Sequence, residues 1–315
     1  RKGDAELNRF ETHKAVSRRR LLGTAFGLSM AAIMPKLAFA AGNGAKAALA
    51  FDGDAILLGG DVLRISSDGG KTWAEHAAPG QVLALATHRG QAGLVLAGLA
   101  KGGVAISEDG GATWRSAAQG LPGGAVNALA IASRDPGLFY AAIQGDGLYK
   151  SEDSGANWAL AMDRPWLNEA ERDPLTLVSV DLETGMGGIW IYAGTELGLT
   201  RVPDCFCRWQ DVQPGNAMDA LVAGDAPPPE NPLPAAEPVL SLASSPTVPE
   251  RLYAALASGI WTSADGGVVW QRMAETPASA VAVHPEDERY IAALMGGNLK
   301  LSRDGGTTWT ATSVV

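Results

Sequence analysis

The chain has 315 residues, with 25 Lys and Arg against 34 Asp and Glu, a formal charge of −9, and only 2 Cys. With 46% hydrophobic and 19% charged residues it is neither disordered nor collagen-like, and two cysteines exclude a disulfide scaffold. Residues 1–40 hold 8 Lys and Arg and 3 Asp and Glu, so residues 41–315 carry a net charge of −14, and an acidic body of this kind repels nucleic acid.

The first 40 residues have the anatomy of an export signal. A basic start is followed by an apolar stretch at residues 21–34 and by a small-residue sequence that ends at Ala40. The string SRRRLLG, with the pair Arg18 and Arg19, resembles the twin-arginine export signal. We therefore expect the twin-arginine translocase to export this protein, already folded, to the periplasm or another extracytoplasmic space. Cleavage after Ala40 is the first interpretation, and an uncleaved membrane anchor is the alternative.

The rest of the chain repeats an eight-residue phrase, Ser-x-Asp-x-Gly-x-Thr-Trp, which we call the box. Five copies are clear, and a worn copy keeps only its Asp and Trp, with Cys205 and Cys207 between them. The Asp and Trp of the six copies are Asp68 and Trp73, Asp109 and Trp114, Asp153 and Trp158, Asp204 and Trp209, Asp265 and Trp270, and Asp304 and Trp309. Successive aspartates are 41, 44, 51, 61 and 39 residues apart. This period indicates a repeat architecture.

Each box is predicted to be a tight turn between two strands. The Asp carboxylate can accept hydrogen bonds from the backbone of its own turn, the glycines allow positive φ, and the Trp packs under the turn. Two further strand-like runs precede each box, for example at residues 126–131 and 138–143. A unit of about 40 residues with four antiparallel strands is the size of a propeller blade.

The box matches the Asp-box, or BNR repeat, and residues 45–315 resemble the Asp-box β-propellers, which include sialidase-type and sortilin-type propellers. The resemblance implies an all-β fold with six four-stranded blades in residues 41–315, after a signal at residues 1–40. Blade one is expected to begin at Ala47 and blade six to supply its own last strand, so that no strand is exchanged between the ends of the chain. In Asp-box families the box is structural, which implies turn staples rather than catalytic carboxylates.

Two long links flank blade four. In a four-strand meander both lie on the face opposite the boxes, and we expect a partner or ligand surface there. The first link, residues 163–174, offers Arg164, Trp166 and Arg172, and the second, the Pro-rich acidic insertion at residues 211–238, offers Asp219, Asp225 and Glu230. The competing interpretation of the links is a solvated Pro-rich linker. Trp166 is either a recognition anchor or a cap on the adjacent blade.

The cysteines and histidines do not predict a metal site. Cys205 and Cys207 are either free thiols or a disulfide in an oxidising compartment. His76, His88 and His284 form no close-spaced set. We expect no metal and no cofactor.

The sequence does not carry the catalytic residues that the resemblance would supply. Sialidases use an arginine-bearing F/Y-R-I-P phrase and a Tyr nucleophile, whereas the nearest string here is LRIS at residues 63–66 and all five tyrosines fall in strand-like runs. Xyloglucanase-like relatives use two Asp in a cleft between two propellers, and this chain has the length of one. No catalytic residue is assigned.

The chain also resembles the photosystem II assembly and stability factors, which are exported Asp-box propellers that bind a protein client. We therefore predict a non-catalytic extracytoplasmic propeller that binds a protein partner, as an assembly factor or accessory subunit of a membrane or redox complex. The alternative is a glycan-binding protein or a glycoside hydrolase of the Asp-box type.

Overall fold

The computed structural model describes residues 47–182, 188–213 and 230–314, all of which belong to the unit Leu37–Val315. The predicted export signal, with Arg18 and Arg19, lies outside the described residues, as does the domain boundary at residue 40. Within the described ranges the chain forms strands and turns and no helix. These ranges therefore contain no helix that could cross a membrane.

Six antiparallel sheets follow one another along the chain, and we number them as blades one to six. The strands of each blade, A to D, are consecutive in the sequence. Blades one to three contain β1 (Ala48–Asp52), β2 (Ala55–Gly59), β3 (Val62–Ser66) and β4 (Ala74–Ala77); β5 (Val82–His88), β6 (Gln91–Leu99), β7 (Val104–Ser107) and β8 (Arg115–Ser116); and β9 (Val126–Ala132), β10 (Asp135–Ile143), β11 (Gly147–Ser151) and β12 (Ala159–Asp163). Blades four to six contain β15 (Thr176–Asp181), β16 (Ile189–Thr195) and β17 (Gly198–Pro203); β18 (Ser241–Ser244), β19 (Leu252–Leu256), β20 (Gly259–Ser263) and β21 (Trp270–Ala274); and β22 (Ala278–Val283), β23 (Ile291–Met295), β24 (Asn298–Ser302) and β25 (Thr310–Ala311).

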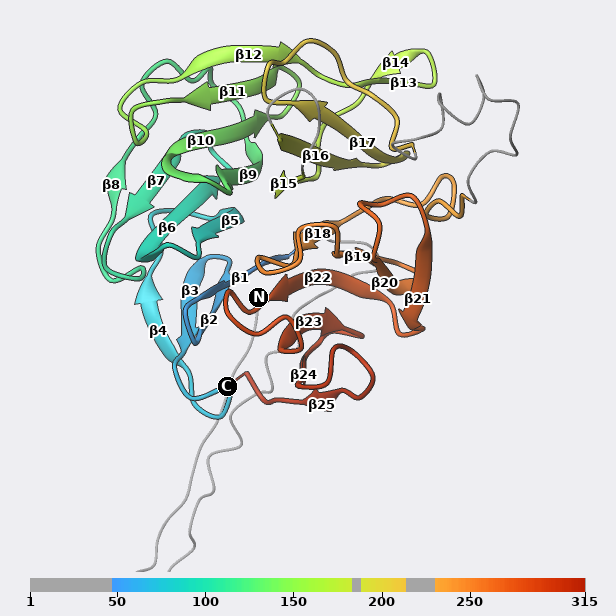
Figure 1. The fold of residues 1–315 in the computed structure, drawn as a ribbon. Coiled ribbons are helices and arrows are strands. Elements are labelled where there is room, and N and C mark those ends of the chain that lie inside the picture. Colours follow the sequence, from blue (N-terminus) through green and yellow to red (C-terminus); the bar gives the residue numbers. More distant parts are fainter. Residues whose placement is uncertain (1–46, 183–187, 214–229, 315) are drawn as a thin grey trace, which may run out of the picture. The chain divides into compact units, whose positions relative to one another are not determined.

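The A strands β1, β5, β9, β15, β18 and β22 contact one another in a ring and face a common centre (Figure 1). The protein is thus a six-bladed β-propeller, as the repeat predicted. Blade four departs from the pattern, because its D strand is reduced to a bridge between Arg201 and Gln210. A separate two-stranded hairpin, β13 (Trp166–Leu167) with β14 (Ala170–Glu171), lies between blades three and four in the chain.

The hydrophobic core lies between neighbouring blades. The B strands are packed on both faces and therefore read as continuous apolar runs, and all residues of β16, β19 and β23 are buried. Ala141, Ala254 and Ala292 on B strands are fully buried, and such small side chains let adjacent sheets approach closely. The D strands at the rim are largely exposed, as in β4 and β8.

In the part of the chain that the structure describes, contacts between side chains close the ring between blades six and one. Strands β1 to β4 and β22 to β25 form separate sheets, so these described strands are not exchanged between the two blades, as predicted. Phe51 of blade one packs edge-on against Tyr290 and His284 of blade six, with ring centroids 5.0 and 5.4 Å away. His284 Nδ1 accepts backbone N–H bonds, which leaves its Nε2 to donate to Asp54 Oδ1 at 3.0 Å across the junction.

Candidate functional site

The box carboxylates are held within their own turns. In the blade-two box, Asp109 Oδ1 accepts bonds from the Thr113 backbone N–H at 2.8 Å and the Ser107 hydroxyl at 2.7 Å, and Asp109 Oδ2 accepts from the Thr113 hydroxyl at 2.6 Å. The Gly111 N–H donates to the Ser107 hydroxyl at 2.7 Å. The same bonds recur around Asp68 and Asp304, and around Asp153 with the Asn157 side-chain amide as donor in place of the Thr hydroxyl. The Asp265 box has Val269 at this position and lacks the side-chain bond. These carboxylates are occupied as turn clamps.

Hydrogen bonding shifts the titration of the box carboxylates. The side chain four residues after the aspartate is the largest cause, followed by the backbone N–H of the same residue, and together they lower the pKa of Asp109, Asp153 and Asp304 to about 2. The same two bonds from Thr72 lower the pKa of Asp68 still further. A carboxyl held ionised in this way is unsuited to act as a general acid near neutral pH.

The box tryptophans join the blades. Each one packs into an apolar cluster between its own blade and the preceding blade, and Trp73 of blade one packs between blades six and one. Trp158 is buried, and its Nε1 donates to the Ala117 carbonyl of blade two at 2.9 Å. Trp209 Nε1 donates in the same way to the Asp163 carbonyl of blade three at 2.8 Å. The tryptophans therefore lie between blades rather than simply beneath their own turns.

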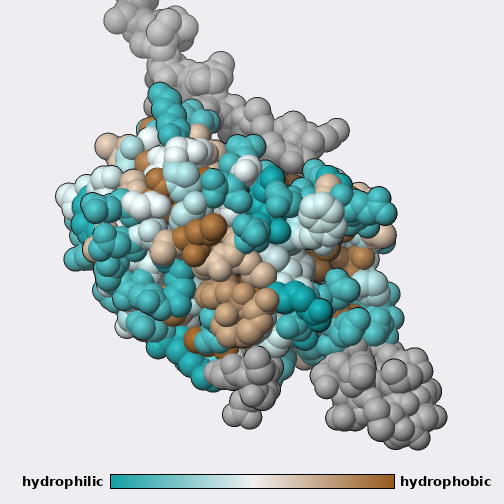
Figure 2. Space-filling view, turned by 90° about the horizontal axis from the view of Figure 1, so that it is seen from above, coloured by the Kyte–Doolittle hydropathy of each residue, from teal (hydrophilic) through white to brown (hydrophobic). Residues whose placement is uncertain are grey.

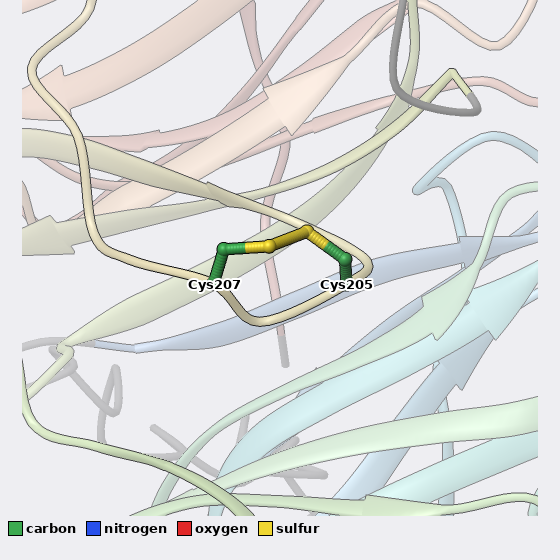
Figure 3. The surroundings of a disulfide bond; sticks show 2 residues. All are labelled: Cys205 and Cys207. Carbon is green, nitrogen blue, oxygen red and sulfur yellow. A yellow bond between two sulfur atoms is a disulfide. The ribbon is translucent and has the colours of Figure 1, made fainter.

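The worn fourth box is held by a disulfide. Cys205 and Cys207 are bonded to each other across one intervening residue (Figure 3), which answers the question that the sequence left open. Phe206 between them takes a positive φ of 51° and packs on Tyr140 of blade three with ring centroids 5.8 Å apart. In the described part of the chain, the Asp204 carboxylate accepts no bond of the kind that clamps the other boxes, so the disulfide stands where the clamp is missing.

The first long link presents Trp166 on a hairpin. The Trp166 side chain is 65% exposed, the most exposed large hydrophobic residue among those described. The hairpin is closed by a two-residue turn in which Asn168 and Glu169 both have positive φ, the geometry of a type I′ turn. Trp166 therefore does not cap a blade, which was one of its two predicted roles.

Ion pairs fix the base of this hairpin. Arg164 pairs with Glu171 and, at 3.3 Å, with Asp173. Burial alone would lower the pKa of the Arg164 guanidinium, but the hydrogen bonds to these two carboxylates raise it. Arg172 pairs with Glu196 at 2.6 Å, and Glu196 lies in the B–C turn of blade four. Both arginines are thus engaged within the protein.

The described part of the second link also packs on the propeller. Asn231 is bonded to the backbone of Trp270, whose N–H donates to the Asn231 carbonyl at 2.8 Å, and Leu233 is buried between blades four and five. Glu237 accepts a bond from Ser258 in the B–C turn of blade five at 2.5 Å. Glu230 is exposed, and Asp219 and Asp225 lie outside the described residues.

The two ends of the propeller can be told apart by these contacts. Both links contact B–C turns, because Asp173 also accepts a bond from Gly145 in the B–C turn of blade three, and this end is the link face. The boxes bond to the A–B ends of their own blades, as where the Gly110 N–H donates to the Gly93 carbonyl and the Gly305 N–H to the Arg289 carbonyl. That opposite end is the box face.

A cavity of about 340 Å³ occupies the centre of the ring and opens at the box face. Its walls come from the A strands of all six blades, and its mouth includes the A–B residues His88, Arg89, Ser133, Asp181 and Thr247. The long links predicted a ligand surface on the link face, and no motif in the sequence indicated this cavity. The signal that could have indicated it is the polar residue that ends several A strands.

The tyrosines and the potential metal ligands were also considered in the sequence as catalytic or binding residues. The five tyrosines, Tyr140, Tyr149, Tyr192, Tyr253 and Tyr290, are all buried. The Tyr149 hydroxyl donates to Asp146 at 2.7 Å, and burial followed by this bond raises the pKa of Tyr149 to about 12. Among the residues that the structure describes, no three His, Cys, Asp or Glu side chains come together as metal ligands.

Comparison with known proteins identifies the fold. No family model and no curated protein matches the sequence. Among solved structures, the chain is similar to the GH74 xyloglucanase from Xanthomonas campestris, with a TM-score of 0.53, 17% identity, and coverage of 84% of this chain and 53% of that one. An ancestral GH74 enzyme gives a TM-score of 0.52 and 15% identity over 85% of this chain and 38% of that one. YCF48 bound to a D1 peptide gives a TM-score of 0.49 and 18% identity over 86% and 83%.

The likenesses to the two GH74 enzymes concern architecture only. The chain spans about half or less of the length of the two GH74 enzymes. The identities are low, so what is shared is the β-propeller fold, and propellers of one architecture host unrelated functions.

Proposed function

We propose that this protein is a non-catalytic propeller that binds a protein partner through its link face, with Trp166 as the anchor. The observation that carries the proposal is the 65% exposed Trp166 side chain on a hairpin whose turn and base are both fixed. Tryptophan is enriched among the residues that dominate binding energy at interfaces. Because the hairpin is already ordered, little conformational entropy remains to be lost when a partner covers it.

The arginines of the link have a different role in this proposal. Arg164 and Arg172 hold the hairpin through Glu171, Asp173 and Glu196, so they position Trp166 rather than contact the partner. Glu230, with Asp219 and Asp225, would supply acidic groups for a basic patch on the partner.

Apolar surface accompanies the hairpin side of the molecule. Leu160 on β12, the strand that leads into the link, is 54% exposed. Figure 2, which looks onto the side that is uppermost in Figure 1, shows apolar surface gathered in the middle of a largely hydrophilic face. Exposed apolar patches of this kind are typical of interaction surfaces.

We further propose an extracytoplasmic location, with export by the twin-arginine translocase through Arg18 and Arg19 and membrane association if the signal stays attached. The Cys205–Cys207 disulfide supports an oxidising compartment. In that compartment the partner would be a membrane or redox complex, of which this protein is an accessory subunit or assembly factor.

Glycan binding is the second candidate, since an exposed indole ring such as that of Trp166 can stack on a sugar ring. Glycoside hydrolysis has less support, because it uses a pair of carboxyl groups about 5–10 Å apart. The described lining of the central cavity supplies one carboxylate, Asp181, and this residue is held by Arg134 through a bond of 2.8 Å to the guanidinium Nε.

The test is purification of the tagged native protein in mild detergent, with mass spectrometry of its companions and of its N-terminus. We expect a stoichiometric membrane or redox complex with the wild type, its loss with Trp166→Ala, and its retention with Arg115→Gln, which removes an exposed side chain at the box face. Equal recovery of the complex with Trp166→Ala would contradict the proposal. A lone protein that begins at Ala41 and binds a glycan array through Trp166 would favour the second candidate.

Deletion of residues 215–237 would be too coarse a test of the acidic insertion. Such a deletion would remove Asn231 and Leu233, which pack against blade five. Replacing residues 215–228 with Gly and Ser of equal length leaves those contacts in place. We expect weaker partner binding at an unchanged melting temperature, and unchanged binding would exclude the insertion from the partner surface.

A further inference from the structure

The walls of the central cavity are formed by the edges of A strands. Each A strand is hydrogen-bonded to a B strand on one side only, so its other edge faces the channel. Hydroxyl groups link some neighbouring A strands, as where the Ser133 N–H donates to Ser179 Oγ at 3.0 Å and Thr87 Oγ1 donates to the Phe51 carbonyl at 2.6 Å. The wall therefore presents hydroxyls together with peptide donors and acceptors, which suits a ligand rich in hydroxyl groups.

Arg89 places a cation across the mouth of the cavity. It follows β5 in blade two, is exposed, and donates from Nη1 to the Pro246 carbonyl of blade five on the far side of the ring. A neutral carbonyl is its only partner among the described residues. The remaining guanidinium N–H groups are free to bind a ligand, and a guanidinium matches a carboxylate through two parallel bonds.

The lining of the mouth carries a cation although the body of the protein is acidic. Asp181, the carboxylate of the described lining, is paired with Arg134, whereas Arg89 has no carboxylate partner among the described residues. The chain beyond residue 40 has a net charge of −14. Clefts focus the field of the charges that line them, so Arg89 favours an anion at this mouth.

We propose that the box-face mouth of the channel binds a small hydroxylated organic carboxylate, such as a hydroxy acid or a uronic acid. Its carboxylate would lie on Arg89, and its hydroxyls would bond to the edges of the A strands and to Ser133, Ser179 and Thr247. The cavity of about 340 Å³ falls within the range of small-molecule sites. The single Arg89 guanidinium balances the charge of a monoanion, whereas a doubly charged phosphate would keep one uncompensated charge. The site lies opposite Trp166 and is independent of partner binding at the link face.

The experiment is calorimetric titration of the full chain with D-galacturonate, D-galactose, acetate and inorganic phosphate. Galacturonate and galactose differ at one carbon, so the pair isolates the carboxylate, while acetate tests charge without hydroxyls. We expect galacturonate to bind at least about tenfold more tightly than each of the other three, because galactose lacks the carboxylate, acetate lacks the hydroxyls and phosphate carries a second charge.

Variants locate the site. Arg89→Gln is expected to weaken galacturonate binding by about tenfold or more, and Arg89→Lys by less, since an ammonium keeps the charge without the paired donors. The matched control is Arg115→Gln, because Arg115 also donates to a carbonyl of another blade, that of Ser154 at 2.9 Å, and lies outside the cavity. Absence of galacturonate binding, equal binding of galactose, tighter binding of phosphate, or equal losses in the Arg89 and Arg115 variants would each overturn the proposal. Melting temperatures of the variants verify that they are folded.

Discussion

Gly111, the second glycine of the blade-two box, lies so close to Leu63 of blade one that a Cβ on Gly111 would be 2.5 Å from Leu63 Cδ2. Gly111 also has a φ of 96°, which an L-residue with a side chain rarely adopts. Its neighbour Gly110 has a similar φ of 73°, but there a Cβ would meet its nearest atom at an ordinary 3.4 Å. The two glycines thus separate backbone strain from contact between blades.

We expect Gly110→Ala to reduce the free energy of unfolding by about 1–2 kcal/mol, the cost of a left-handed backbone. Gly111→Ala should cost about 2–4 kcal/mol, because overpacking against the buried Leu63 adds to that strain. Urea denaturation measures both. The double variant Leu63→Ala/Gly111→Ala should lose less than the sum of its single changes, since the smaller side chain makes room. Equal costs for the two glycines would show that the contact with blade one does not matter.

The sequence repeat predicted the features that each blade forms by itself. It did not predict the contacts that form only when blades meet. The box spacing and the apolar runs predicted the four-stranded blades and their arrangement as a propeller, because each blade has the same local sequence pattern. The contact of Gly111 with Leu63 could not be foreseen, since it depends on how one sheet is rotated against the next. The channel mouth was missed for the same reason, because Arg89 meets Pro246 only when blades two and five face each other. The sequence left a disulfide and free thiols as alternatives for Cys205 and Cys207 and could not decide between them.

Truncation of Trp166 and truncation of Trp270 should have very different effects on the free energy of unfolding. Trp166→Ala is expected to change the free energy of unfolding by less than about 0.5 kcal/mol, because the side chain is exposed. Trp270→Ala should cost about 3–5 kcal/mol, because Trp270 is buried between blades four and five. Thermal and urea unfolding of the two variants checks this contrast. A large loss of stability in Trp166→Ala would assign this residue to the fold and remove the basis of the anchor.

The box carboxylates predict a specific loss of stability in acid. The pKa values of Asp109, Asp153 and Asp304 are lowered from 3.8 to about 2, so the unfolded chain takes up protons before the folded one does. Their stabilising contribution is therefore complete above pH 4 and is lost as the pH falls towards about 2. Urea midpoints measured between pH 2 and 6 should fall steeply across this window. The variant Asp109→Asn/Asp153→Asn/Asp304→Asn should be less stable at neutral pH and show a shallower fall, whereas the exposed Glu230→Gln should follow the wild type.

The stability of the fourth box should depend on its disulfide, whereas the stability of the other boxes depends on their Asp carboxylates. Reduction, or the variant Cys205→Ser/Cys207→Ser, is expected to cost about 1–2 kcal/mol, the contribution of a very short covalent loop. Asp204→Asn should leave stability nearly unchanged, because no turn clamp is formed by this carboxylate among the described residues, whereas Asp109→Asn weakens bonds of 2.6–2.8 Å. Melting curves with and without a phosphine reductant make the comparison, and the double serine variant should be insensitive to the reductant. If Asp204→Asn proved as costly as Asp109→Asn while reduction cost nothing, the disulfide would not be what holds this turn.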